Sequence, residues 1–171
     1  MLEILTPLNK CERVSRQVDP ATFTAVPGVW AQVQSDGSLL NVLSTVNALI
    51  NKLVIGSASS NVYESNDVEV GRITTLESIG VRCKVGTEGF TGFPTQGDFM
   101  TVSSNLNTLG KLISIGAAYD GTYEVVARCE EVNIAGGYII FRTISPYIAV
   151  STVSLSLSPS SSASSSASPS A

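Results

Sequence analysis

The sequence predicts a mainly β protein, either a small antiparallel β-barrel or a sandwich, with an extended N-terminal arm and a C-terminal tail. Three observations predict this class. Short runs rich in β-branched and aromatic residues recur at a spacing of roughly 10 to 14 residues, which is typical of barrels and sandwiches and not of βαβ units. Turn-forming residues separate these runs. The length of 171 residues suits one domain with one core. Only 14% of the residues are charged, so the surface must consist mostly of uncharged polar groups.

We expect three regions along the chain. Residues 1–20 form an N-terminal arm, in which short apolar pieces alternate with charges up to the turn signal Asp19-Pro20. Residues 21–147 form the β-barrel domain. Residues 148–171 begin as an extended strand and continue as a tail that contains only Ser, Ala and Pro from residue 158 onward. Such a composition cannot build a core.

The first strands of the domain surround a turn. Apolar residues alternate from Val26 to Val33, and Asp36-Gly37, a strong hairpin signal, follows them. Residues 39–54 are ambiguous. Their apolar residues have the spacing of a helical face, whereas their β-branched residues and asparagines are poor helix formers. One short helix near 39–54 and a strand are therefore both consistent with the sequence.

From residue 62 onward the signals are those of strands. Runs of alternating or β-branched residues, bounded by Gly, Asn, Asp or Pro, predict strands at 68–74, 80–86, 99–103, 111–115, 123–129 and 137–144. Gly136-Gly137 supplies the last hairpin turn. Trp30, Phe99, Tyr123 and Phe141 lie inside the expected strands, and we assign them to the core. Phe90 and Phe93 suit either the core or an exposed contact loop.

No catalytic apparatus is expected. The chain contains no histidine, which excludes mechanisms that need an imidazole base or a His-ligated metal. Residues 86–92 have the wrong glycine spacing for a dinucleotide site, and Gly110-Lys111 lacks the rest of a P-loop. Glu130 and Glu131 are neighbours on a strand, so they point to opposite faces. We therefore expect a protein that is not an enzyme, with no catalytic residues, no cofactor and no metal site.

The charge and the cysteine content limit the possible partners and the cellular compartment. The formal net charge is -4 and the cations are scattered, so nucleic-acid binding is disfavoured. The three cysteines, Cys11, Cys83 and Cys129, suggest packed thiols made in a reducing compartment. The N-terminal residues lack the pattern of a signal peptide, and no run is long enough for a membrane helix, so we expect no membrane partner.

Several of these segments resemble one protein family. Residues 97–102, the turn at Gly110-Lys111-Leu112, residues 123–130 and residues 137–143 resemble small β-barrel capsid decoration (cement) proteins of tailed bacteriophages. The opening segment Val26–Trp30 with Asp36-Gly37 is similar to the first hairpin of that family. These motifs are strand and turn patterns, and they carry no signature of a reaction.

The resemblance implies a virion structural protein. It implies that the chain binds the outer surface of an icosahedral phage head and stabilises it by bridging capsid subunits. The expected partners are the major capsid protein and the chain itself, as a homotrimer. The expected location is the capsid surface of the virion, after synthesis in the host cytoplasm. The alternatives are another β-rich virion component, such as a tail or head-to-tail joining protein, and a carbohydrate-binding module.

Subunit and capsid contacts are expected at both ends of the chain. The candidate contact residues are apolar and lie in the arm and in the tail: Leu2, Ile4, Leu5, Leu8, Val153, Leu155 and Leu157. Because the last three alternate with serine, we expect residues 148–171 to leave the barrel as a strand that pairs with a neighbouring subunit.

Overall fold

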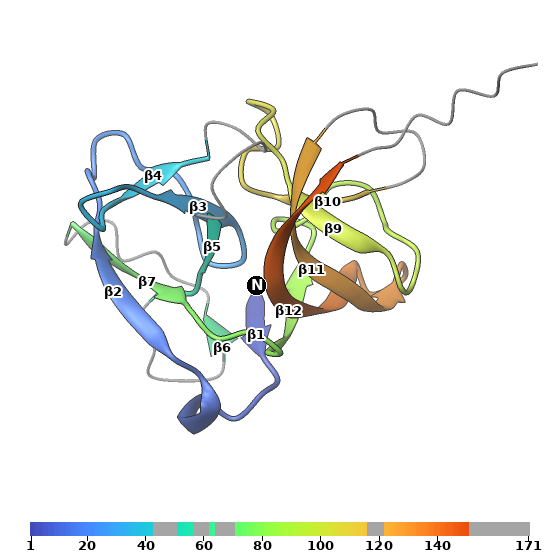
Figure 1. Cartoon of the computed structure of the whole chain (residues 1–171). Helices are drawn as coiled ribbons and strands as arrows, with labels where there is room; N and C mark the ends of the chain where they lie inside the picture. Colours follow the sequence, from blue (N-terminus) through green and yellow to red (C-terminus); the bar gives the residue numbers. More distant parts are fainter. Residues whose placement is uncertain (43–50, 57–61, 64–70, 116–121, 151–171) are drawn as a thin grey trace, which may run out of the picture.

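The computed structural model of the chain consists of two antiparallel β-sheets, which confirms the mainly β class (Figure 1). It describes residues 1–42, 51–56, 62–63, 71–115 and 122–150. Within these residues the single helical element is η1, one 3-10 turn at Leu8–Lys10. The strand pairings of the described residues leave both sheets open and close no barrel. A sandwich-like arrangement of two sheets therefore fits the fold.

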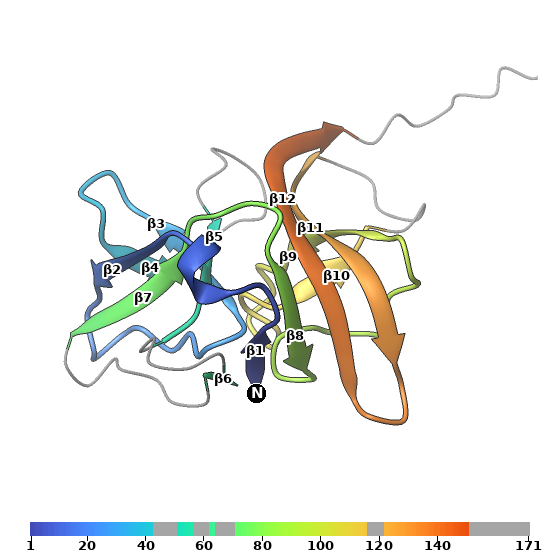
Figure 2. The ribbon, with the colours of Figure 1, turned by 90° about the horizontal axis from the view of Figure 1, so that it is seen from below.

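Sheet A has seven strands, and their order brings together both ends of the described chain. From edge to edge they are β10 (Leu112–Ser114), β9 (Phe99–Val102), β11 (Thr122–Asn133), β12 (Tyr138–Val150), β8 (Arg82–Gly86), β1 (Leu2–Ile4) and β6 (Val62–Tyr63). The long hairpin of β11 and β12 forms the outer part of this lobe (Figure 2). In β8 the buried and partly exposed residues alternate, as expected for a strand with one face on a core.

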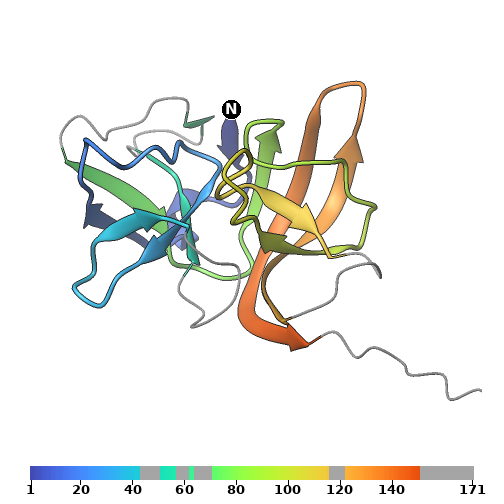
Figure 3. The ribbon, with the colours of Figure 1, turned by 90° about the horizontal axis from the view of Figure 1, so that it is seen from above.

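Sheet B has five strands and forms the second lobe (Figure 3). From edge to edge they are β2 (Arg13–Gln17), β7 (Arg72–Leu76), β5 (Asn51–Val54), β3 (Trp30–Val33) and β4 (Leu39–Asn41). Of these, β3 lies between β4 and β5. Along each of β3 and β5, successive side chains point to opposite faces of the sheet.

Two hydrophobic cores lie on the two faces of sheet B. The larger core combines Trp30 and Leu53 of sheet B with sheet A residues such as Ile4, Val85 and Phe141, and it therefore joins the sheets. The smaller core lies on the opposite face of sheet B, where the segment 18–29 covers it with Val18, Phe23, Ala25 and Val29. Burial of these apolar side chains is the main favourable contribution to folding.

The hairpin between β3 and β4 lies where Asp36-Gly37 predicts it. The Gly37 N–H donates to Gln34 O (2.9 Å) and the Gln34 N–H donates to Ser38 O (2.8 Å), which makes a three-residue loop. Gly37 has φ +83°, the left-handed conformation that this loop requires at its last position. The prediction of a hairpin is confirmed, and the loop is one residue longer than a two-residue turn.

A glycine allows the loop of sheet A to contact sheet B. The Trp30 N–H donates to Gly110 O over 2.8 Å, so the loop between β9 and β10 pairs with the start of β3. A Cβ atom at Gly110 would lie 2.5 Å from Trp30 O, and the residue has φ +76°. Only glycine fits this contact without a shift of the backbone.

The structure corrects the expected N-terminal arm. Residues 2–4 are β1, which pairs with β8 and β6 inside sheet A, and residues 13–17 are β2, at the edge of sheet B. The local sequence predicts an arm because the strands of this segment are three and five residues long and contain charges. Strands this short are stabilised by partners about 60 positions or more further along the chain (Leu2 with Val85, Val14 with Thr75), and no local pattern reveals such partners.

The structure describes both ends of the ambiguous segment 39–54 and corrects the boundary at residue 147. Residues 39–41 and 51–54 are strands β4 and β5, in agreement with the strand alternative there, while 43–50, where a short helix was the other alternative, lie outside the described residues. The strand β12 continues past residue 147 to Val150 and stays paired with β11 of the same chain. Residues 148–150 therefore belong to the domain, and the rest of the expected tail lies outside the described residues.

Candidate functional site

The outer face of sheet A gathers arginines that are far apart in the sequence. In the register of the sheet, Arg128 lies opposite both Phe99 and Arg142, and Arg142 lies opposite Arg82. Residues directly opposite each other on antiparallel strands share a face. Phe99, Arg128, Arg142 and Arg82 thus form a row across β9, β11, β12 and β8, which we call the arginine row.

One carboxylate bridges two members of the arginine row. Glu130 accepts a hydrogen bond from Arg82 Nε (2.6 Å) and another from Arg142 Nε (2.5 Å). Partial burial acts to raise the pKa of Glu130, but the two hydrogen bonds and the two positive charges outweigh it and lower that pKa. Glu130 is therefore ionised at neutral pH. Both arginine side chains remain 43% exposed.

An exposed aromatic pair lies at the end of the arginine row. The rings of Phe99 and Tyr147 meet edge to face, with centroids 6.3 Å apart and planes at 82°. Phe99 is 44% exposed and Tyr147 is 42% exposed. The Arg128 guanidinium lies 5.7 Å from the centroid of the Phe99 ring, and its Nε donates to Gly97 O. Within the described residues, Arg128 has no carboxylate partner.

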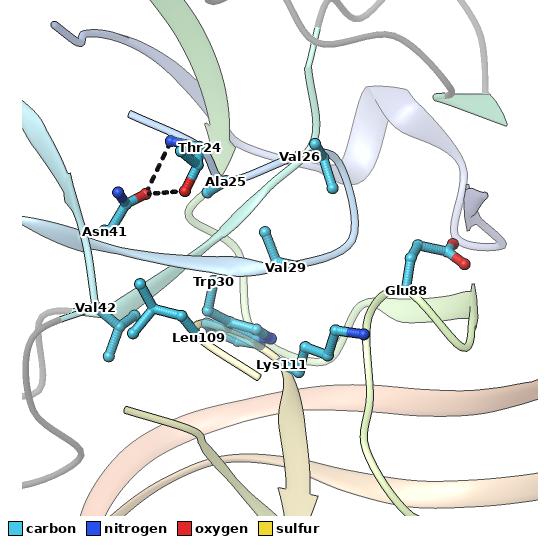
Figure 4. A pocket seen from close by; sticks show the side chains of 10 residues that line it. All are labelled: Thr24, Ala25, Val26, Val29, Trp30, Asn41, Val42, Glu88, Leu109 and Lys111. Atoms are coloured by element: carbon cyan, nitrogen blue, oxygen red, sulfur yellow. Dashed lines mark hydrogen bonds between the residues drawn. The ribbon is translucent and has the colours of Figure 1, made fainter. Parts of the chain in front are cut away.

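A hollow of about 240 Å³ lies near the junction of the sheets (Figure 4). Its walls are mainly apolar and include Val29, Trp30, Val42 and Leu109. Asn41 lies on one side, where its Oδ1 accepts hydrogen bonds from the backbone N–H and the hydroxyl of Thr24. The apolar part of the hollow suits an apolar side chain, while Thr24, Asn41, Glu88 and Lys111 supply polar groups to its lining.

A buried polar contact connects the two sheets. Asn51 of β5 donates from Nδ2 to Glu124 Oε2 of β11, and both side chains are almost completely buried. Burial raises the pKa of Glu124, although the hydrogen bonds from Asn51 and the charge of Lys52 oppose the rise. Among the described residues, Glu124 Oε1, Asn51 Oδ1 and Trp30 Nε1 have no hydrogen-bond partner. The polar atoms at this junction are thus incompletely satisfied, which is costly in a core.

The cysteines are packed thiols. Cys83 and Cys129 are buried and Cys11 is partly buried, and all three are free. Burial raises the pKa of all three thiols, that of Cys129 to about 11. Thiols with such values are protonated at neutral pH and are poor nucleophiles. Their burial agrees with the packing role expected from the sequence.

The structure contradicts two of the expected contact residues. Leu2 and Ile4 are completely buried in the core between the sheets, so they cannot contact another subunit while the domain is folded. Leu5 is partly buried, and the partly buried Leu8 packs against the same core. Val153, Leu155 and Leu157 lie outside the described residues.

The residues of the outer face carry little signal in the sequence. The strand position of Phe99 predicts burial, yet Phe99 is exposed, whereas Trp30 and Phe141 are buried as expected. Of the two loop aromatics, Phe90 is buried and Phe93 is 41% exposed. The arginine row was missed because Arg82, Arg128 and Arg142 become neighbours only through the register of sheet A. The one local signal was the outward position of Arg82 in the alternation of β8.

Comparisons with known proteins gave no match for the chain. No family model, no curated protein and no solved structure matches it. Among the described residues no group of three or more potential metal ligands lies together. None of their helices has the length and apolar character that a membrane crossing requires.

Proposed function

We propose that the chain is a virion structural protein of the capsid decoration type. In this proposal a homotrimer binds the outer surface of an icosahedral phage head and bridges subunits of the major capsid protein. The observation that carries it is the arginine row with its exposed aromatic pair, because this is a rigid surface that is equipped for binding a protein. The resemblance of the strand and turn motifs to decoration proteins supplies the kind of partner.

The chemistry of the outer face supports a protein partner that presents carboxylates. Arginine and tyrosine are enriched among the residues that contribute most to protein interfaces. Arginine binds a carboxylate through two parallel hydrogen bonds, and Arg128 has no such partner within the described residues. The row also concentrates positive charge in a chain whose net charge is -4. An acidic patch on the capsid would therefore pair with this face.

Capsid binding tests the proposal. Empty heads assembled from the major capsid protein of the same genome are mixed with the purified chain, and the bound fraction is measured by cosedimentation. Arg128→Glu should weaken binding by about tenfold or more, since each lost charge-assisted contact contributes roughly 1.5–3 kcal/mol. Lys10→Glu is the matched control, because it makes the same charge change at an exposed position of η1. Equal binding by both variants and the wild type would contradict the proposal.

Electron micrographs of the same mixtures separate the alternatives. Copies distributed over the shell support a decoration protein, whereas a ring at one vertex indicates a head-to-tail joining protein. A carbohydrate-binding module commonly presents a flat aromatic platform, and the edge-to-face arrangement of Phe99 and Tyr147 does not form one. Binding to glycans and not to capsids would overturn the proposal.

A further inference from the structure

Four strands lie at the edges of the two sheets, and they are protected to different degrees from pairing with a strand of another chain. Of these, β2 carries Arg13 and Arg16, and charges on an edge discourage pairing with another chain. The outer side of β10 is covered, since the Thr91 N–H donates to Leu112 O and the Leu112 N–H donates to Gly89 O, both over 2.9 Å. The third edge, β6, is only two residues long.

The fourth edge, β4, has no comparable protection among the described residues. Its residues are Leu39, Leu40 and Asn41, none of which is charged, and β3 is its single strand partner. The Gln34–Ser38 hydrogen bond identifies which opposite residues of β3 and β4 are joined by backbone hydrogen bonds and which are not. By the alternation of an antiparallel ladder, the N–H and C=O groups of Leu39 and Asn41 point outward. These groups are free to pair with an added strand.

Two hollows lie along this edge and share Asn41. One is the 240 Å³ hollow walled by Trp30, Val42 and Leu109 (Figure 4). The other is about 170 Å³ in volume and is lined by Thr22, Phe23, Leu40 and Asn41. An unpaired edge beside apolar hollows is the arrangement in which proteins bind an extended peptide as an additional strand, with alternate side chains held in the hollows.

We propose that β4 is the acceptor for residues 151–157 of a second copy of this chain, which pair with it as an added strand. The segment has the required chemistry: it is uncharged, and Val153, Leu155 and Leu157 alternate with serines that leave the opposite face small and polar. It follows directly on Val150, the last residue of β12, so the chain is already extended where the segment starts.

The arrangement of the lobes indicates a second copy and not the same chain. The end of β12 lies in the lobe of sheet A and β4 lies in the lobe of sheet B, as all three views show (Figures 1 to 3). Residues 151–157 span about 23 Å when extended at roughly 3.3 Å per residue, so they reach a neighbouring molecule easily. Because the donor and acceptor surfaces differ, each copy can give its tail to the next, and such a head-to-tail contact closes into a ring when the rotation between successive copies completes a full turn.

Subunit complementation tests this inference in solution, without capsids. Leu40→Lys places a charge on the acceptor edge, and Leu155→Asp places one in the donor segment. Each variant alone should associate at least about tenfold more weakly than the wild type, because one or two backbone hydrogen bonds and an apolar contact are lost. An equimolar mixture should form a 1:1 heterodimer, since the intact tail of the first variant meets the intact edge of the second.

Native mass spectrometry and sedimentation velocity measure the outcome. Leu106→Lys is the matched control, because it makes the same substitution at a leucine that is 90% exposed and lies between β9 and β10. Formation of the heterodimer also shows that both variants are folded. A mixture that stays monomeric, association of Leu40→Lys equal to that of the control, or a monomeric wild type would overturn the inference. The trimer of the proposed function agrees with this contact, but the test does not depend on capsid binding, so the two proposals can fail separately.

Discussion

The two faces of the hairpin β11–β12 show how the same strands support a buried core and an exposed charged surface. On the inner face Phe141 is completely buried, whereas its neighbour Arg142 on the outer face keeps 43% of its side chain exposed. This follows from the alternation of side chains along a strand. We therefore expect the inner face to contribute more to stability than the outer face.

Two of the three carboxylates of β11, Glu124 and Glu130, show the same contrast in their pKa values. Glu124 is buried between the sheets beside Asn51, and burial raises its pKa. Glu130 is on the outer face, and Arg82 and Arg142 lower its pKa against the effect of partial burial. Stability contributed through Glu124 is thus present at low pH, and stability contributed through Glu130 is present at high pH. The same residue type responds to pH in opposite directions on the two faces.

The largest expected effect is at the inner face. Phe141→Ala should lower the free energy of unfolding by about 3–5 kcal/mol, through lost apolar contacts and the cavity left behind. The adjacent Arg142→Ala should change it by about 1 kcal/mol or less, because exposed ion pairs contribute little. Urea denaturation followed by the fluorescence of Trp30, the single tryptophan, measures both. Similar losses for the two variants would show that the faces do not differ as the structure indicates.

A smaller effect is expected at the buried carboxylate. Glu124→Gln should raise the free energy of unfolding at pH 8 by about 1–3 kcal/mol, since it removes a buried charge and provides an N–H group that can donate to Asn51 Oδ1. In the wild type the contribution of Glu124 is full below its ordinary pKa of 4.5 and is lost as the pH rises through its higher folded-state value. The difference between the two proteins should therefore grow from pH 4.5 to pH 8.

Urea titrations at a series of pH values check this expectation. Glu131→Gln is the control, since Glu131 is the exposed carboxylate of the same strand. If the free energies of unfolding of Glu124→Gln and the wild type differ by a constant amount across this pH range, burial does not raise the pKa of Glu124.

The fold class was predictable because it depends on local signals. Alternation and turn residues predicted strands that the structure contains as β8 to β12, and Asp36-Gly37 predicted the hairpin of β3 and β4. The segments in which local patterns are least informative, residues 1–20 and the described ends of 39–54, contain strands of three to five residues. Strands β1 and β2 pair with partners about 60 positions or more away, and β5 pairs with β3 and β7, so local periodicity does not reveal these strands.

The candidate site was less predictable than the fold for the same reason. Arg82, Arg128 and Arg142 look scattered in the sequence, and a row forms only when β8, β11 and β12 pair in one register. Phe99 was assigned to the core since aromatic residues in strands are usually buried. Its exposure depends on the pairing of β9 with β11, which places it opposite Arg128. Surface chemistry in a sheet thus depends on register, whereas the core depends mainly on periodicity.

The smallest expected effect is at the outer face, and it tests the opposite pH response. Glu130→Gln should lower the free energy of unfolding at pH 7 by about 0.2–1 kcal/mol, because the contacts with Arg82 and Arg142 are partly exposed and screened by water. The wild type has this contribution above pH 4.5, the ordinary pKa of the group, and loses it as the pH falls through the lowered folded-state value. The two proteins should therefore become equally stable in acid.

High salt at pH 7 should reduce the difference in the same way, since screening weakens ion pairs between exposed groups. Urea titrations at pH 7 and pH 3, with and without 1 M NaCl, make this measurement. A loss that persists in acid would indicate that Glu130 acts through packing and not through its charge.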